Sequence, residues 1–299
     1  MDLRQLRHFA AVLEARSFSV AARDLDVTQP VLTRSIRDLE RSLRVSLFER
    51  DYRGTRPTPA GVEFHRHVRR ILNDCERAEQ EVATLRTGGV GRISIGAGAS
   101  YMSDLLADVT ARVVEEMPAL EIEVVEGLIE NLLSPLYDGR IDLIFTTFAA
   151  FPIRPDLVLE PLVTVIPGVV AGARHPIVRR RDAKLAELMR FDWASLCQPY
   201  TLDVLQRLFQ SNQLVPPDPI QVESLDLIKA LVLSGRFLAL LPNRAVAREL
   251  AAGTVVRLPF EVPAAPLPSG IIYLQQRPRT AAMNRVMELL REACLRSAR

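Results

Sequence analysis

The stretch that most constrains this chain covers residues 17–43 and reads SFSVAARDLDVTQPVLTRSIRDLERSL. It contains two short helical patterns that are separated by a polar break. In the second pattern, Leu32, Ile36, Leu39 and Leu43 recur at spacings of four, three and four. At about 100° per residue these side chains share one stripe of a helix, so we expect that stripe to be buried.

The ends of these two patterns indicate how the helices meet. Thr28 is in place to act as the N-cap of the second helix, and Pro30 falls in its first turn, where a missing N–H costs nothing. Ala21 and Ala22 keep the first helix thin enough for the second to cross close to it. The stretch therefore predicts a helix-turn-helix, whose second helix enters the major groove of DNA.

The outward side of the second helix carries hydroxyl and guanidinium donors, which suit an anionic partner. These residues are Pro30, Thr33, Arg34, Arg37 and Arg41. We expect the segment that starts at Gln29 to touch DNA. The predicted contacts in this helix are Gln29, Pro30, Thr33, Arg34 and Arg37.

A first helix and a basic loop complete the predicted N-terminal domain, or head. The helix is marked by apolar residues from Leu3 to Leu13, and Leu47 and Phe48 are expected to enter the same core. Beyond them, arginines alternate with turn formers in a pattern typical of a wing along the phosphates. The arginines are Arg50, Arg53 and Arg56. They should supply affinity that does not depend on sequence, while the helix supplies discrimination. A solvated basic loop is the alternative interpretation.

Several motifs of the head occur in an ordered series between Phe9 and Gly61, namely SFSVAARDL, TQPVLTRSIRDLE, LFER and TPAG. This series resembles the N-terminal domain of LysR-type transcriptional regulators. The length of the chain and its later β/α pattern resemble the family as well. The resemblance implies a winged helix-turn-helix at residues 1–59, activation or repression of transcription, tetramers, and RNA polymerase as a further partner.

Composition bounds the remaining possibilities. A chain of 299 residues is long enough for two domains. Its net charge of +2 hides an asymmetry, because residues 1–70 hold 14 Arg against 9 Asp and Glu. The three cysteines, Cys75, Cys197 and Cys294, are far apart and favour a reducing cytoplasm over a disulfide framework. No signal peptide or apolar stretch of 18 residues is evident, so we expect no membrane contact.

Residues 60–87 are predicted to form one long helix that links two domains. Apolar residues repeat along it at alternating spacings of four and three: Phe64, Val68, Ile71, Cys75, Ala78, Val82 and Leu85. Such a seam needs a partner helix, so it predicts self-association through the pairing of two protomers; the tetramer is implied by the family resemblance alone. About 26 residues span roughly 40 Å. His65 and His67 point apart on this helix and are expected to be exposed rather than to bind a metal.

After a hinge at residues 88–91, the composition predicts an α/β domain over residues 92–299. Strands are expected at 92–98, 120–126, 141–146, 163–170 and 237–241. Helices are expected at 102–116, 128–138, 202–210, 225–234 and 281–296. The alternation βαβαβ at the start predicts a parallel sheet covered by helices.

The family resemblance implies that this domain has two subdomains, like a periplasmic solute-binding protein. The chain would cross between them near residues 160–164 and 263–268, with the last helix returning to the first subdomain. Subdomain I would then cover about 92–162 and 266–299, and subdomain II about 163–265. A surface loop is the alternative for the proline-rich residues 259–268.

A small-molecule effector is expected where strands end in an open α/β sheet. The first strand end reads Gly98-Ala99-Ser100-Tyr101, and free N–H groups there would favour an anion. The resemblance adds Thr147 and the loop of Pro199, Tyr200 and Thr201 to the effector site. Ala99 lacks the hydroxyl common in the family, and Thr147 stands where some members that sense aromatic carboxylates have arginine. An organic acid is the candidate class, while a purely structural role is the alternative for these residues.

Enzymatic signatures are missing from the sequence. No phosphate-binding loop, G-x-S-x-G, H-E-x-x-H or paired-cysteine metal spacing occurs, and Gly96-x-Gly98 lacks the rest of a dinucleotide motif. We expect no catalytic residue, cofactor or metal. The competing hypothesis is a metabolic enzyme with an appended DNA-binding domain. For Cys197, a packed thiol is favoured over a redox sensor.

Overall fold

The computed structural model describes residues 1–51, 54–87, 91–148, 154–180, 182–197, 199–264 and 266–297. The chain divides into two compact units. One consists of residues 1–93 with 133–142, and the other of residues 94–132 with 143–299. The expected hinge at 88–91 lies largely outside the described residues, since only Gly91 is described.

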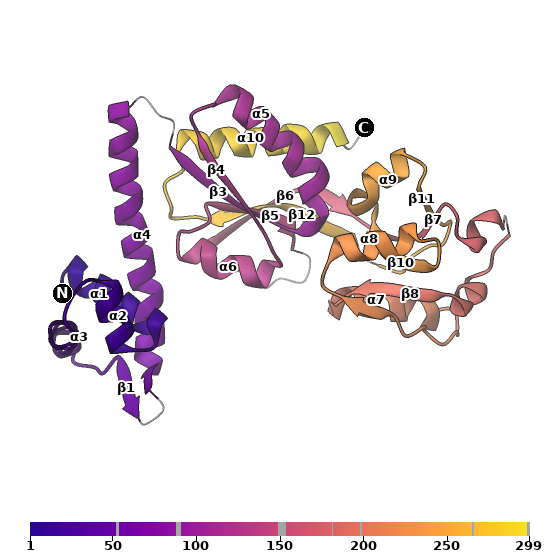
Figure 1. Cartoon of the computed structure of the whole chain (residues 1–299). Coiled ribbons are helices and arrows are strands. Elements are labelled where there is room, and N and C mark those ends of the chain that lie inside the picture. The colour runs from indigo at the N-terminus through magenta and orange to yellow at the C-terminus, as the bar shows by residue number, and fades with distance from the viewer. Residues whose placement is uncertain are drawn as a thin grey trace. The chain divides into compact units, whose positions relative to one another are not determined.

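The head begins with a compact group of helices followed by a hairpin and a long helix (Figure 1). Its elements are α1 (Leu3–Ala15), α2 (Phe18–Asp24), α3 (Gln29–Leu43), β1 (Phe48–Asp51), β2 (Gly54–Pro57) and α4 (Pro59–Thr87). Asp2 and Gln5 form a reciprocal capping box at the start of α1, and the Ser17 side chain caps α2. Thr28 is the N-cap of α3 as predicted, but its side chain makes no capping hydrogen bond.

One apolar cluster holds the head together, and it confirms the predicted periodicity. Leu32, Ile36 and Leu39 of α3 are fully buried, and Leu43 packs at the edge of the cluster. The other buried members come from α1, α2, the hairpin and the first turns of α4, and they include Leu6, Phe9, Val12, Phe18, Ala21, Leu47, Phe48, Val68 and Leu72. The predicted entry of Leu47 and Phe48 into this core is therefore confirmed.

The first large sheet has the strand order β4-β3-β5-β12-β6. The strands are β3 (Arg92–Ala97), β4 (Glu121–Glu126), β5 (Leu143–Thr147), β6 (Leu157–Val165) and β12 (Leu267–Leu274). β3 and β5 are parallel, whereas β12 is antiparallel to both β5 and β6. The predicted parallel arrangement is confirmed for β3 and β5, but the sheet is mixed, because it also contains β12, which was not predicted as a strand. β12 enters from the far end of the chain, so no helical crossover dictates its direction.

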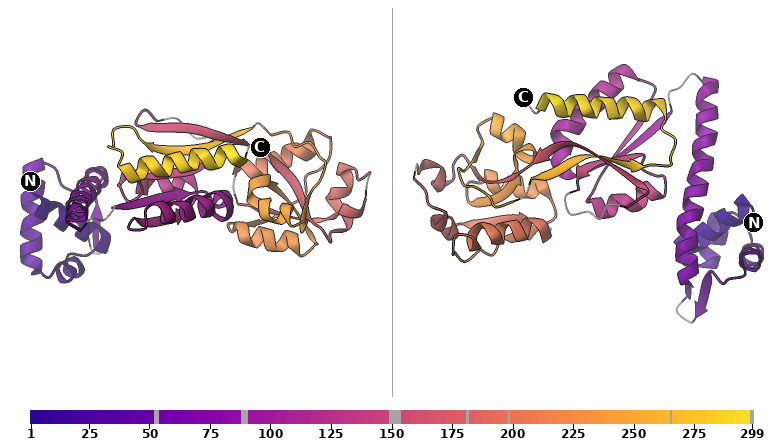
Figure 2. Two further views of the ribbon diagram at one scale, coloured as in Figure 1. Left: turned by 90° about the horizontal axis from the view of Figure 1, so that it is seen from above. Right: turned by 180° about the vertical axis from the view of Figure 1, so that it is seen from behind.

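Helices of the first sheet include α5 (Ala107–Glu116), α6 (Ile129–Tyr137) and α10 (Ala281–Ser297). α5 and α10 pack together on one face of this sheet, and Figure 2 shows α10 running along that face in both views. The predicted helix 102–116 does not start as an α-helix. A 3-10 turn at Ala99–Tyr101 and a π-helix at Met102–Leu106 precede α5. Single π turns of this kind often occur at functional sites.

The second sheet has the order β11-β7-β10-β8-β9. Its strands are β7 (Pro167–Gly172), β8 (Asp192–Leu196), β9 (Ile220–Val222), β10 (Phe237–Pro242) and β11 (Val255–Arg257). Its α-helices are α7 (Pro199–Gln210), α8 (Leu225–Leu233) and α9 (Ala247–Ala251), and short 3-10 helices lie at Pro176–Arg179, Leu185–Arg190 and η5 (Asn243–Val246). The expected strand 163–170 is in fact two strands in different sheets, because the chain leaves β6 after Val165 and starts β7 at Pro167.

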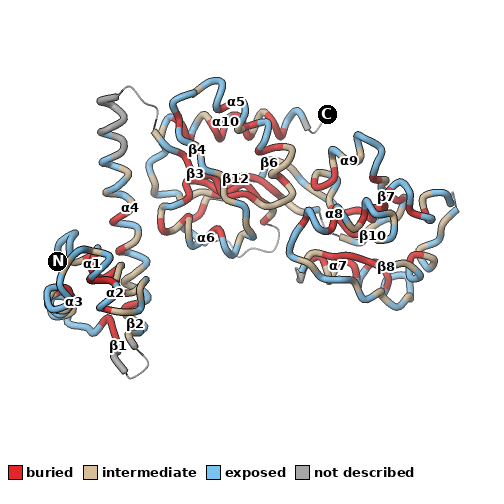
Figure 3. Tube along the Cα trace, in the orientation of Figure 1, coloured by how far each residue is buried: buried red, intermediate tan, exposed pale blue. Residues whose placement is uncertain are grey.

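Side chains of the second sheet alternate between two cores. Val169 and Leu238 lie in a cluster with α7 residues such as Phe209, whereas Val170 and Ala239 lie in a cluster with α8 residues. This two-residue period is expected for strands covered on both faces. Figure 3 shows the buried residues concentrated along the strands of both sheets. None of the described helices is long and apolar enough to span a membrane.

Candidate nucleic-acid interface and effector cleft

The outward face of α3 gathers the side chains that the sequence predicts to touch DNA. Gln29, Pro30, Arg34 and Arg37 are exposed, and Thr33 is half-buried beside them. A shallow hollow of about 650 Å³ runs along this face. It is lined by Gln29, Pro30, Thr33, Arg34, Arg37, Asp38 and Arg41. The helix therefore presents a continuous polar and basic surface directly opposite its buried leucine and isoleucine stripe.

Three contacts that the sequence analysis did not identify shape this face. Asp38 lies 3.1 Å from an Arg41 nitrogen and 4.0 Å from the Arg34 Nε, so one carboxylate sits among the cations. The Ser19 hydroxyl donates to the Gln29 Oε1 at 3.1 Å. Because that bond occupies the Gln29 carbonyl oxygen, it orients the amide at the N-terminus of α3.

The β1–β2 hairpin is fixed to α3 through Glu40. The Glu40 Oε1 accepts hydrogen bonds from the backbone N–H of Leu47 at 2.8 Å and of Phe48 at 3.2 Å. Gly61 of α4 approaches the same segment so closely that a Cβ there would lie 2.2 Å from the Leu47 carbonyl oxygen. Glu40 belongs to the LTRSIRDLE motif, but its partners lie seven and eight residues away, beyond any helical spacing.

The wing arginines are only partly described. Arg56 is exposed on β2, opposite Glu49 in the hairpin register. The backbone of Arg50 pairs with Thr55 in the same register. Arg53, at the hairpin tip, lies outside the described residues. The hairpin thus has the geometry expected of a wing, with at least one arginine in contact with solvent.

In the second unit, a buried cluster of hydroxyl groups lies where the strands β3 and β5 end. The Tyr101 hydroxyl donates to the Ser269 Oγ at 2.6 Å and lies 2.8 Å from the Thr147 Oγ1. Thr147 and Ser269 are themselves 2.9 Å apart. Tyr101 is only 2% exposed, and burial of its hydroxyl raises its pKa. Its ring packs edge-on against Phe145.

This cluster shows where two of the predicted effector residues point. Tyr101 and Thr147 are close together, and their hydroxyls bond to each other and to Ser269 rather than standing free. Ser269 comes from β12 and was not predicted, because it lies 168 residues beyond Tyr101. Ala99 and Ser100 are half-buried in the 3-10 turn, whose N-cap is Gly98. Ala99 packs against the core of the second sheet.

The remaining predicted effector residues begin α7. Pro199 is the first residue of the helix, and Thr201 is 9% exposed. The Tyr200 ring packs at the edge of the α7 core, and its hydroxyl is inaccessible and has no hydrogen-bond partner among the described residues. Burial raises the pKa of Tyr200 as well. An unsatisfied buried hydroxyl is a group that a ligand or a water can satisfy.

Cys197 and His65 differ from their expected environments, whereas His67 is exposed as expected. Cys197 is exposed, so the prediction of a packed thiol was wrong for this residue; Cys294 is the buried one, and burial raises its pKa to about 11. His65 is half-buried rather than exposed, and burial lowers its pKa. Among the residues with described positions, no three His, Cys, Asp or Glu side chains are grouped so as to hold a metal ion.

Known protein families match both parts of the chain. Residues 3–62 match the family described as "Bacterial regulatory helix-turn-helix protein, lysR family", and residues 86–295 match "LysR substrate binding domain". The SDS degradation transcriptional activation protein of a Pseudomonas strain is 30% identical over 260 residues, which cover 86% of this chain and 84% of that protein. The transcriptional dual regulator GltC of Bacillus subtilis is 29% identical over 296 residues, covering 97% and 96%.

A solved structure agrees in fold. Full-length CbnR in complex with its target DNA superposes with a TM-score of 0.69 at 23% identity, covering 98% of this chain and all of the other. The relatives are named as regulators of transcription, which argues against the alternative of a metabolic enzyme. The chain therefore belongs to the LysR family, and it is a transcriptional regulator with an N-terminal helix-turn-helix domain that binds DNA and a C-terminal domain that binds an effector.

Proposed function

We propose that α3 reads promoter DNA through Gln29, Pro30, Thr33, Arg34 and Arg37. The observation that carries this proposal is the exposed polar face of α3 above a fully buried stripe, which lets the helix enter a major groove without losing its own core. Arg50, Arg53 and Arg56 of the wing would contact phosphates and add affinity that depends on salt rather than sequence.

The long helix α4 supports self-association as a dimer or tetramer. Phe64 and Val68, at the start of its seam, pack into the head, whereas several of the described seam residues beyond them are exposed. Ile71 is 36% exposed and Val82 60% exposed, and Ala78 between them is exposed too. A second copy of α4 would bury this seam, and pairing would present two recognition helices to a partly palindromic site.

The effector is proposed to bind near the hydroxyl cluster, in contact with Ala99, Ser100, Tyr101, Thr147, Pro199, Tyr200 and Thr201. The free hydroxyl of Tyr200 supports this placement. Because the Tyr101 and Thr147 hydroxyls already bond within the protein, they would act by holding the strand ends in place. The Tyr101 N–H donates to the Gly98 carbonyl oxygen, so the main-chain N–H groups of residues 99 and 100 would supply most of the polarity. A small organic acid with few charged groups fits this environment better than one held by a guanidinium.

The remaining parts of the assignment follow from these three. The DNA-binding domain is proposed to cover residues 1–59, the dimerisation helix 60–87, the hinge 88–91 and the effector domain 92–299. A regulator of promoters would act in the bacterial cytoplasm and contact RNA polymerase. The effector would shift the arrangement of the oligomer only if it favoured one closure of the effector domain over another.

Binding to the intergenic DNA upstream of the gene tests the proposal directly. The purified full-length protein would be titrated against that DNA and against a random duplex over a range of salt concentrations, with footprinting alongside. A protected site with dyad symmetry and strong preference over the random duplex is the expected result. Binding that depends on salt but shows no preference would reduce the head to a general DNA-coating surface.

A further inference from the structure

Two hollows flank the place where the chain passes from the first sheet to the second. The larger, of about 890 Å³, is lined by β6 residues from Pro161 to Val165, by residues of η5 and α9, and by Asp104 of the π-helix. The smaller, of about 580 Å³, is lined by residues 257–262 and Ile166. Arg257 and Ile166 belong to both, so the Arg257 side chain stands between the two hollows.

The wall formed by β6 is the open edge of the first sheet. β6 pairs with β12 on one side only and ends the strand order. Five consecutive residues of the strand, 161–165, line the hollow, as expected where a cavity runs along a strand edge. The edge therefore offers backbone N–H groups that no neighbouring strand uses.

Two guanidinium groups face the larger hollow, and neither is fully neutralised. Arg244 is 11% exposed, and among the described residues its one ion pair is a single contact of 3.3 Å with Asp104. Arg257 donates to the Asn243 Oδ1 at 2.5 Å and has no carboxylate partner in the described part of the chain. Asp104 is the only acidic residue among the described residues that line this hollow, so with the two arginines these residues carry a net positive charge.

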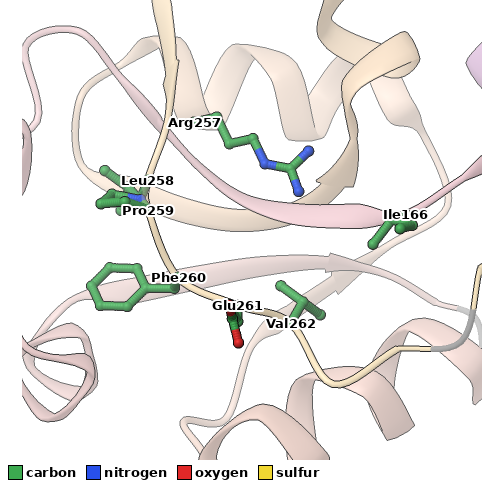
Figure 4. Close-up of a pocket in the computed structure, with 7 residues that line it drawn as sticks. All are labelled: Ile166, Arg257, Leu258, Pro259, Phe260, Glu261 and Val262. Atoms are coloured by element: carbon green, nitrogen blue, oxygen red, sulfur yellow. The ribbon is translucent and has the colours of Figure 1, made fainter.

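Arg257 is an exposed side chain that is oriented by its hydrogen bond to Asn243. Its guanidinium lies against Gly168, where a Cβ would come within 2.6 Å of it, so a larger residue at position 168 would displace the side chain. Figure 4 shows Arg257 reaching away from Leu258 and Pro259 toward the side where Ile166 lies. The smaller hollow also contains Glu261, which balances Arg257 there and makes that side a poorer anion site.

We propose that the larger hollow is a second ligand site, which takes a small dicarboxylate. One carboxylate would bond to the fork of Arg257 and the other to Arg244, in competition with Asp104, because planar guanidinium groups match carboxylates in two-point contacts. The volume falls within the range of small-molecule sites. None of its lining residues belongs to the effector contacts proposed near Ser100 and Tyr200.

Occupation of this site would act on the arrangement of the two sheets. Asp104 belongs to the π-helix that follows the Tyr101 turn, whereas Arg244 and Arg257 belong to the second sheet and its helices. A dicarboxylate that draws Arg244 from Asp104 would loosen one contact across the two halves of the effector domain while bridging them itself. The site is thus placed to modulate the response to an effector in the cleft.

Calorimetric titration of the full-length protein tests the site, with succinate as the probe and ionic strength held constant. Arg257→Gln should weaken succinate binding at least tenfold, and Arg257→Lys, which keeps the charge but lacks the fork, should weaken it less. Arg248→Gln is the matched control, because Arg248 is an exposed arginine on α9 that does not line the hollow. Fluorescence of Trp193, buried in the second sheet, checks that each variant folds.

A second comparison separates this site from the cleft. The double variant Ser100→Ala with Tyr200→Phe should bind succinate as tightly as the unmodified protein. Loss of binding in that variant together with normal binding by Arg257→Gln would place succinate in the cleft and overturn the proposal. The absence of succinate binding by the unmodified protein, or binding of inorganic phosphate in preference to succinate, would overturn it as well. DNA binding without ligand should be the same for Arg257→Gln and Arg248→Gln.

Discussion

The recognition face of α3 and the predicted effector cleft are built in opposite ways. On α3, every donor proposed to meet DNA comes from nine consecutive residues, and the same short segment supplies the buried stripe beneath them. At the predicted effector site, the hydroxyl cluster joins Tyr101, Thr147 and Ser269, which come from three distant strands or turns and bond to one another. A surface made by one helix can be recognised from its sequence period, whereas a site made from strand ends depends on tertiary pairing.

The most direct test of this comparison is to truncate a buried side chain beneath the exposed face of α3 while leaving the second unit unchanged. Ile36→Ala should lower the free energy of unfolding of the head by about 2–5 kcal/mol, because the side chain is fully buried. The chain has a single tryptophan, Trp193, in the second unit. The unfolding transition of the head, followed by circular dichroism, should move to lower denaturant concentration. The transition of the second unit, followed by Trp193 fluorescence, should stay unchanged.

Val31→Ala provides the matched control for that experiment. Val31 lies on the same helix but is 52% exposed, so its loss should change stability by less than about 0.5 kcal/mol. An equal shift of both transitions in Ile36→Ala would mean that the head does not unfold separately from the effector domain.

A change in the hydroxyl cluster should instead affect the stability of the second unit and leave the head unchanged. Tyr101→Phe removes one hydroxyl, but Thr147 and Ser269 can still bond to each other, so the loss should be modest, about 0.5–1.5 kcal/mol. It should appear in the Trp193 fluorescence transition and leave DNA affinity without effector unchanged. A loss above about 3 kcal/mol would show that the three hydroxyls depend on one another more strongly than their pairwise contacts indicate.

Within the head, the wing should contribute affinity for any DNA, whereas α3 should contribute sequence discrimination. Arg56→Gln should weaken binding to cognate and random DNA by the same factor. It should also lower the slope of log K against log salt by about 0.9, as expected for one lost phosphate contact. Titrations at several salt concentrations measure both effects. Unequal weakening of the two duplexes would instead assign Arg56 to base recognition.

The smallest expected effect concerns the two cysteines of the effector domain. Cys197 is exposed, whereas Cys294 is buried and has a pKa of about 11, so only a small fraction of its thiol is ionised at pH 8. A thiol reagent at that pH should modify Cys197 quickly and Cys294 only after unfolding. Mass spectrometry of the labelled peptides identifies each site, and rapid labelling of Cys294 would contradict the described packing.

The sequence allowed prediction of features that repeat within one element. The stripe of α3, the length of α4 and the C-terminal helix could all be predicted, because a helix repeats its pattern every three or four residues. The strand β12 was not predicted, because Pro268, Ser269 and Gly270 interrupt its apolar run, so its antiparallel direction could not be predicted either. Ile166 was also missed as a crossing point, because the apolar residues around it continue from one sheet into the next.

The same difference, between a site on one element and a site assembled from distant elements, explains which candidate residues could be predicted. Gln29, Thr33 and Arg34 could be chosen from spacing alone, and the structure places them on one exposed face. Ser269 and the hollow between Arg244 and Arg257 had no signal in the sequence, because their members are far apart along the chain. Asp38 was visible in the sequence, but its position between Arg34 and Arg41 emerges only from the helix geometry.

The measurement that tests the central claim most directly is the ratio of cognate to random DNA affinity for Thr33→Ala and Arg34→Ala, with Arg248→Ala as a control. If α3 reads base edges, each head variant should lose about 1–3 kcal/mol of specific binding and the control should lose none. The random-duplex affinity of Thr33→Ala should remain unchanged. An unchanged ratio in both head variants would contradict the assignment of this face as the recognition surface.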